Sequence, residues 1–262
     1  MKLKENKENQ DVKDYLRKGY IIKDITQIQS LHYIRKIFIK EIIKIFPDQK
    51  NKNEEHILNN IHKKLKIKNL NEFRLKIFNN INSNEKFKMS YYKLSKEFLD
   101  CIVGNELVMQ SRVNLSIQIP EDSSSLLPIH ADTWSGVSPF EVVVWLPLVN
   151  CYKTKTMYFL KKKNVSKVNK ILLNKKLTTD QIFQKIEKDV EWLELQYGQV
   201  LIFDQSIPHG NVVNKEIETR WSMNCRFKGI FTPYGDKKLG EFFEPISLKP
   251  ASLRGINYKH PF

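Results

Sequence analysis

Two histidines and one aspartate in this sequence stand where they could hold a metal ion. His130 and Asp132 are two residues apart in PIHADTW, and in extended backbone such side chains project from the same face. His209 follows a second expected strand in FDQSIPHGN. Two histidines and one carboxylate are a ligand set for non-haem Fe(II) that leaves coordination positions open. We therefore expect His130, Asp132 and His209 to bind iron as the catalytic centre.

An arginine eleven residues after His209 offers an anion-binding group. Arg220 and Ser222 alternate on one face of an expected strand, and Arg226 lies farther along it. A guanidinium in apolar surroundings is costly unless an anion pairs with it. A dicarboxylate would supply that anion, bound bidentately by Arg220 with help from the Ser222 hydroxyl. Arg226 is a competing candidate for this anion, and it could instead face a substrate.

Two aromatic residues are candidate substrate contacts. Trp134 directly follows the metal-binding segment, and Tyr158 lies in TMYFL. An aromatic residue beside a strand is also a common core residue, so both alternatives stay open.

The first hundred residues are expected to form helices that support the site. Apolar residues from Ile28 to Ile45 recur at three- and four-residue steps, and Thr26 with Gln29 predicts a capping box. This helix should end before Pro47. Weaker helical patterns cover 57–65, 70–81 and 94–102, and Gly104 closes the last one.

After residue 104 the apolar period changes from that of a helix to that of strands. Strands are expected at 112–120, 140–148, 199–203 and 220–230. Several short strands without intervening helices indicate an antiparallel sandwich or jelly roll. We expect one α+β domain, with a helical layer at 1–104 and a core at 105–262. The core carries a Lys-rich insert near 161–190, with a helix capped near Thr179 or Asp180.

Composition limits the class of protein. The chain has 262 residues, 11% of them aromatic, and a formal charge of +15, which suits a folded protein with a sizeable core. Its three cysteines are too few for a disulfide framework. No stretch reaches the length of a membrane span, and no signal peptide is visible, so a cytoplasmic protein is expected.

The positive charge does not make nucleic acid the leading partner. Residues 101–150 hold one basic and five acidic side chains and no lysine, yet they contain two of the three expected metal ligands. Only 7 of the 44 basic residues are arginine, the residue that specific recognition of phosphates and bases favours. An anionic small molecule remains an electrostatically suitable substrate.

The order of these motifs resembles a known enzyme family. The sequence is similar to Fe(II)/2-oxoglutarate dioxygenases of the phytanoyl-CoA dioxygenase-like superfamily. It most resembles the sporadic carbohydrate cluster 2-oxoglutarate/iron oxygenases, in two blocks. These blocks are NLSIQIPEDSSSLLPIHADTWSGVSPFEVVVWLPLVN and GQVLIFDQSIPHGNVVNKEIETRWSMNCRFKGIFTPYG. The resemblance covers roughly residues 100–240.

This resemblance implies a fold, cofactors and roles for individual residues. It implies a double-stranded β-helix core, iron at the three ligands, 2-oxoglutarate as co-substrate, and dioxygen. Arg220 and Ser222 would hold the distal carboxylate of 2-oxoglutarate. Asn114 and Gln118 would orient co-substrate or substrate, or could equally be solvent-facing positions of their strand. Related halogenases have a small residue in place of the acid, so Asp132 implies hydroxylation or a related C–H oxidation. The implied substrate is a sugar or a nucleotide-linked sugar.

Two alternatives remain beside this interpretation. The same chemistry could act on nucleic acid or protein, which the charge would suit. The chain could also be an inert jelly-roll module that binds sugar. The sequence leaves the oligomeric state and the oxidised carbon open.

Overall fold

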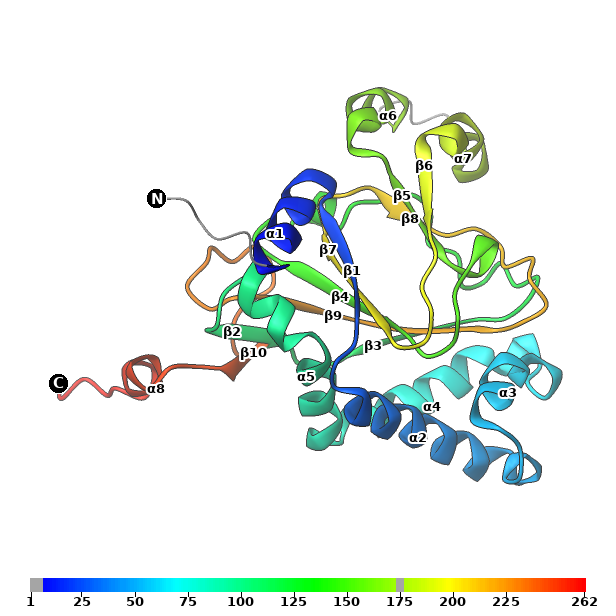
Figure 1. Cartoon of the computed structure of the whole chain (residues 1–262), viewed down its shortest axis with the longest axis horizontal. Helices are drawn as coiled ribbons and strands as arrows, with labels where there is room; N and C mark the ends of the chain where they lie inside the picture. Colours follow the sequence, from blue (N-terminus) through cyan, green and yellow to red (C-terminus); the bar gives the residue numbers. More distant parts are fainter. Residues whose placement is uncertain (1–6, 173–176) are drawn as a thin grey trace.

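Antiparallel sheets and a layer of helices make up the computed structural model, which describes residues 7–172 and 177–262 (Figure 1). Within these residues, seven strands form one sheet in the order β1-β7-β4-β9-β2-β10, with β3 also paired to β9. A second sheet has the order β6-β5-β8. The strands are β1 (Tyr20–Asp24), β2 (Leu107–Gln110), β3 (Asn114–Gln118), β4 (Val142–Pro147), β5 (Met157–Leu160), β6 (Val190–Leu193), β7 (Gln199–Asp204), β8 (His209–Gly210), β9 (Arg220–Gly229) and β10 (Phe243–Ser247).

The long strand β9 organises the larger sheet. It pairs with β4 on one edge, and with β3 and then β2 on the other. Its sequence RWSMNCRFKG alternates polar and apolar residues, so the two kinds of side chain point to opposite faces. The apolar set, which includes Trp221 and Met223, is fully buried. The polar set, with Arg220 and Ser222, therefore shares the other face.

A layer of helices holds the apolar face of β9 in place (Figure 1). The Trp221 ring packs edge-on against Phe38 and Phe73, with ring centroids 6.1 Å apart in each pair. Its indole Nε1 donates a 2.9 Å hydrogen bond to the backbone oxygen of Leu58. This packing fixes the direction of the neighbouring polar side chains on β9. The helices are α1 (Lys7–Lys18), α2 (Ile28–Ile45), α3 (Glu54–Asn59), α4 (Leu70–Asn82), α5 (Glu85–Ile102), α6 (Val165–Leu172), α7 (Thr179–Ile186) and α8 (Pro250–Ile256).

Aromatic contacts join the smaller sheet to the larger one. Phe159 of β5 packs against Phe203 of β7 and Tyr20 of β1, with ring centroids 4.9 and 5.4 Å away. Helices α6 and α7 lie between β5 and β6 in the chain and stand at the top of Figure 1. These two helices fall within the stretch where the sequence predicts an insert.

Most of the expected elements are confirmed. Helix α2 ends before Pro47, and α4 and α5 cover the later helical patterns. Strands β3, β4, β7 and β9 fall where strands were expected. The mixture of helices with antiparallel sheets confirms the α+β class. None of the helices in the described ranges has both the length and the apolar character needed to cross a bilayer.

Two local expectations, the cap of α2 and the all-helical first hundred residues, are wrong, and the expected cap of the insert helix is displaced by one residue. Helix α2 begins after Gln27 without a side-chain cap, because the Thr26 hydroxyl donates to Glu97 instead. The N-cap of α7 is Thr178, whose side chain and Gln181 form a capping box. The first hundred residues also include a strand, β1, because its short apolar run can complete the sheet beside β7.

Candidate metal site

The loop segment that carries His130 and Asp132 lies beside the short strand β8, which carries His209. His130 and His209 exchange two backbone hydrogen bonds of 2.9 and 2.8 Å, and the backbone N–H of Asp132 donates to the oxygen of Gln205 at 3.0 Å. One ligand atom each from His130, Asp132 and His209 lies within 4.8 Å of the others. In the part of the chain that the structure describes, this is the one such group of three potential ligands. The arrangement can hold a single metal ion.

Backbone carbonyls set the orientation of both imidazoles. Nδ1 of His130 lies 2.7 Å from the oxygen of Pro128, and Nδ1 of His209 lies 2.8 Å from that of Ile207. A carbonyl oxygen only accepts, so each Nδ1 carries a hydrogen, and in the neutral ring the lone pair is then on Nε2. Such outer hydrogen bonds fix the tautomer and the ring orientation that metal binding needs.

Burial keeps His209 in its neutral form. The buried side chain of His209 has lost most of its contact with water, and this is the main reason why its pKa is lowered to about 4. Electrostatic repulsion by the nearby His130 lowers the pKa further. A neutral imidazole is the form that binds metal. His209 is therefore ready to act as a ligand at neutral pH without first losing a proton.

Arg220 is a buried cation without a counter-ion. It is 3% exposed, and its guanidinium donates to the Thr156 backbone oxygen at 3.2 Å and to the Ser116 hydroxyl at 3.1 Å. Its Nε has no hydrogen-bond partner, and neither has the buried Ser222 hydroxyl. Among the described residues no carboxylate lies within 4 Å of the guanidinium, and burial lowers the pKa of Arg220. The cavity therefore contains a buried positive charge that an anionic ligand could neutralise.

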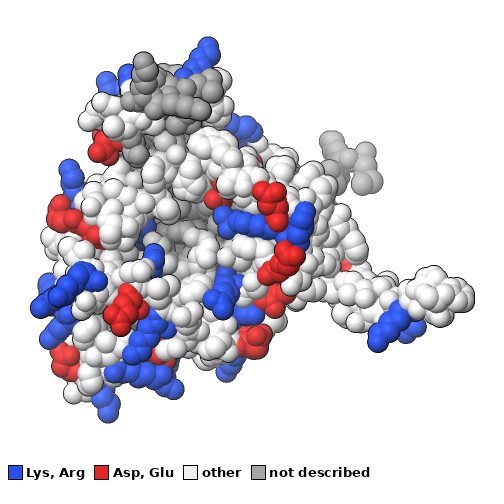
Figure 2. Space-filling view, turned by 180° about the vertical axis from the view of Figure 1, so that it is seen from behind, with Lys and Arg blue, Asp and Glu red and all other residues white. Residues whose placement is uncertain are grey.

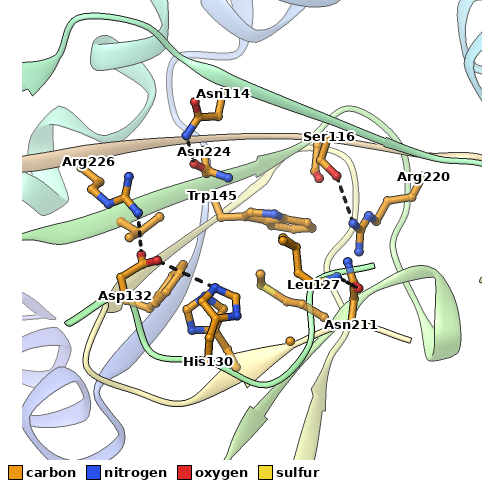
Figure 3. Close-up of a pocket in the computed structure, with 16 residues that line it drawn as sticks. Asn114, Ser116, Leu127, His130, Asp132, Trp145, Asn211, Arg220, Asn224 and Arg226 are labelled. Atoms are coloured by element: carbon orange, nitrogen blue, oxygen red, sulfur yellow. Dashed lines mark hydrogen bonds and ion pairs between the residues drawn. The ribbon is translucent and has the colours of Figure 1, made fainter. Parts of the chain in front are cut away.

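The three potential metal ligands and Arg220 line one cavity of about 240 Å³ (Figure 3). Apolar side chains of Val143, Trp145 and Phe203 contribute to its wall. Figure 2 shows a hollow in the face opposite to that of Figure 1, with both basic and acidic side chains around it. The cavity can bring an anionic ligand on Arg220 into contact with a metal ion at the other end.

Arg226 lies at the metal end of this cavity and is already paired (Figure 3). Its Nη2 is 3.0 Å from Oδ2 of Asp132. Its Nε donates to the Gln205 side-chain oxygen at 3.2 Å and is 4.0 Å from Oε2 of the fully buried Glu141. Gln205 in turn donates to Glu141 at 3.2 Å. Of the two candidate arginines, Arg220 is thus the one left without an anion.

The remaining expected site residues divide between the cavity and other places. Asn114 lines the cavity and donates to Asn224 at 2.9 Å. Gln118 does not line it, because its amide donates to the Val212 backbone oxygen at 2.6 Å. Trp134 is 51% exposed and is not among the described residues that line this cavity.

Tyr158 lines a neighbouring cavity of about 350 Å³ instead. Its ring packs against Phe183 of α7 and Trp192 of β6, with centroids 5.1 and 5.5 Å away. Asn211 lines both cavities, and a side chain at Gly210, which lines the cavity of the potential metal ligands, would collide with the Tyr158 hydroxyl. Tyr158 therefore does not contribute to the wall of the metal cavity.

Sequence reasoning missed several residues of the site. Ser116 and Asn224 line the cavity because they alternate with apolar residues on β3 and β9, a signal that was available. Glu141 and Gln205 lie on different strand ends, and no spacing in the sequence indicates that they meet.

Solved structures with the same arrangement of elements include a non-heme monooxygenase. No protein-family model matches the sequence, and no curated protein matches it. The structure of ThoJ, a non-heme monooxygenase, in complex with nickel is 11% identical, with a TM-score of 0.57 over 91% of this chain and 84% of that one. HygX from Streptomyces hygroscopicus with nickel and 2-oxoglutarate bound is 8% identical, with a TM-score of 0.53 over 88% and 89%.

AviO1 from Streptomyces viridochromogenes extends this likeness, at 12% identity and a TM-score of 0.53 over 87% of this chain and 97% of that one. The chain shares their fold. At such identities the likeness concerns the fold alone, so the assignment of chemistry rests on the side chains described above.

Proposed function

We propose that this protein is an Fe(II)- and 2-oxoglutarate-dependent oxygenase that oxidises a C–H bond of a small molecule. One observation carries the proposal. The buried guanidinium of Arg220, which lacks a counter-ion, shares a cavity with two histidines and a carboxylate that can hold one metal ion. A dicarboxylate that also chelates the metal would satisfy both ends of the cavity. The cofactor-bound structure of HygX gives a precedent for 2-oxoglutarate within this fold.

The chain's own residues fit this pair of ligands. Nε2 of each histidine and a carboxylate oxygen of Asp132 would hold the iron, and Arg220 with Ser222 would hold the distal carboxylate of 2-oxoglutarate. Iron and 2-oxoglutarate, once bound, supply the activation of dioxygen needed for C–H oxidation. The protein orients the ligands, keeps His209 neutral and covers one part of the cavity wall with the apolar side chains of Val143, Trp145 and Phe203.

The finer features of the proposal follow from the sequence resemblance. We propose that the two sheets correspond to a double-stranded β-helix, with residues 1–104 and 105–262 in one cytoplasmic domain. The presence of Asp132 favours hydroxylation over halogenation, because the carboxylate would occupy the position that a halide needs. The proposed substrate is a sugar or a nucleotide-linked sugar. Asn114 would contact it or the co-substrate from the cavity wall.

A comparison of two 2-oxo acids tests the role of Arg220. The metal-loaded protein is titrated by calorimetry with 2-oxoglutarate and with 2-oxopentanoate, which has the same chain length but no distal carboxylate. The wild type should bind 2-oxoglutarate about 30-fold or more tightly than 2-oxopentanoate, since truncation of one partner of a buried charge pair costs about 2–5 kcal/mol. The Arg220→Met variant should lose this preference.

Two results would contradict the proposed function. A wild type that takes up no Fe(II) would favour the inert sugar-binding module. If the wild type binds both 2-oxo acids equally, Arg220 does not bind the distal carboxylate of 2-oxoglutarate. Release of succinate from 2-oxoglutarate in the presence of Fe(II) and dioxygen then measures the chemistry directly.

A further inference from the structure

The two carboxylate oxygens of Asp132 have different surroundings (Figure 3). Oδ1 lies 3.8 Å from Nε2 of His130, on the side of the potential metal ligands. Oδ2 lies 3.0 Å from Nη2 of Arg226. One oxygen is thus directed to the metal end of the cavity, while the other is engaged by a cation.

Arg226 is itself held in place from behind. Gln205 accepts a 3.2 Å hydrogen bond from its Nε, and Glu141, which is fully buried, lies 4.0 Å from the same atom. The Gln205 amide is fixed in turn by bonds to the Ser138 backbone oxygen at 2.6 Å and to Glu141 at 3.2 Å. A guanidinium constrained on several sides has little freedom to release Asp132.

We propose that Arg226 is a positioning residue that restricts Asp132 to binding the metal through Oδ1 alone. This inference rests on the proposed function. A carboxylate can bind a metal through one oxygen or through both. If both oxygens of Asp132 bound, only two of six positions would remain, and a chelating 2-oxo acid would fill them. With Oδ2 on Arg226, three positions remain, which is the number that a chelate and dioxygen need.

The first test uses Co(II) in place of iron, without any 2-oxo acid. The visible absorption bands of Co(II) change with its coordination number and geometry. In the Arg226→Met variant Oδ2 is released and can join the metal, so these bands should differ from those of the wild type. The Arg220→Met variant is the matched control on the same face of β9, and its Co(II) bands should equal those of the wild type.

The second test measures affinity of the Co(II)-loaded proteins for 2-oxoglutarate and 2-oxopentanoate. Arg226→Met should weaken both acids by a similar factor of about 10 or more, the usual size of effects from residues that support a ligand. Both acids share the end that chelates the metal. Arg220→Met should weaken only 2-oxoglutarate.

These results separate failure of this inference from failure of the proposed function. Unchanged Co(II) bands in Arg226→Met would overturn the positioning role, even if affinity for the acids fell, because Arg226 would then contact the acid itself. A wild type that binds neither metal nor 2-oxoglutarate would overturn the proposed function instead.

Arg226→Lys covers the case in which the methionine variant does not fold. Lysine keeps the positive charge between Asp132 and Glu141 but lacks the planar fork that engages Oδ2 and Gln205 together. Its Co(II) bands should shift in the same direction, with a smaller loss of affinity for both acids. Bands and affinities equal to those of the wild type would overturn the inference.

Discussion

The two arginines on the polar face of β9 have opposite electrostatic surroundings. Arg226 is placed between the carboxylates of Asp132 and Glu141, whereas Arg220 has only neutral oxygens from Thr156 and Ser116. Arg220 is buried and the Arg226 side chain is 14% exposed, and both line the same cavity. The difference shows that a strand can present two identical side chains for different purposes. Arg226 completes an ionic network within the protein, whereas Arg220 has no anionic partner among the described residues, which is why we propose a ligand for it.

The largest effect should come from removing the metal end of the cavity altogether. We expect His130→Ala to abolish release of succinate from 2-oxoglutarate, because a histidine and a carboxylate alone hold a metal weakly. Coupled succinate detection measures this loss. Turnover at the wild-type rate would show that the metal is elsewhere, and the comparison between the two arginines would then lose its functional meaning.

Removal of Arg226 should destabilise the metal-free protein by about 3–5 kcal/mol, because it leaves the carboxylates of Asp132 and Glu141 buried without their cation. Urea unfolding at neutral pH measures the change. The double variant Arg226→Met with Glu141→Gln is the control. It also removes the negative charge of Glu141, so it should recover part of the lost free energy of unfolding. A loss below 1 kcal/mol in the single variant would mean that the network is weaker than its geometry indicates.

The metal end should also make stability depend on pH. The folded pKa of His209 is about 4, below its ordinary value of 6.5, so the unfolded chain binds the proton more readily between these values. This contribution to the free energy of unfolding is complete above pH 6.5, falls as the pH decreases towards 4, and amounts to about 3 kcal/mol at most. Urea titrations of the metal-free protein between pH 7 and 4.5 measure it.

His209→Gln provides the control for that pH series, because glutamine stays neutral throughout. Its stability should decline less steeply over the same interval. Parallel curves for the two proteins would show that His209 does not account for the dependence.

The smallest expected effect has the opposite sign to that of Arg226. Arg220→Met should raise the stability of the ligand-free protein by about 1–3 kcal/mol, since it replaces an uncompensated buried charge with an apolar side chain. Thermal unfolding without any 2-oxo acid measures this gain. A destabilised variant would indicate that Arg220 contributes to the structure as Arg226 does.

Sequence reasoning found the parts of the site that depend on local pattern. The spacing of His130 and Asp132, and the alternation that places Arg220 and Ser222 on one face, are properties of extended backbone. The contacts that these residues make across the sheets cannot be read from local pattern, because the pairing of distant segments determines that Gln205 meets Arg226. Local pattern likewise predicted α2 and β4 but not β1, which is stabilised by its partner strand more than by its own sequence.

The limits are clearest for the residues assigned by proximity to a motif. Trp134 is next to the metal-binding segment in sequence, yet it points to solvent. Gln118 alternates correctly on β3 but is used to hold the backbone at Val212. Position along a strand predicts the face of a side chain, whereas its hydrogen-bond partner depends on which loop covers that end of the strand.

The paired backbone hydrogen bonds between His130 and His209 have a consequence for synthesis of the chain. While the ribosome has released only the segment around His130 and Asp132, the nascent protein contains two of the three proposed metal ligands. The third arrives with β8, after the insert helices α6 and α7 have been made. The complete set of proposed ligands is therefore available only after most of the polypeptide has emerged, and the strand β9, which carries both arginines of the cavity, follows β8 directly.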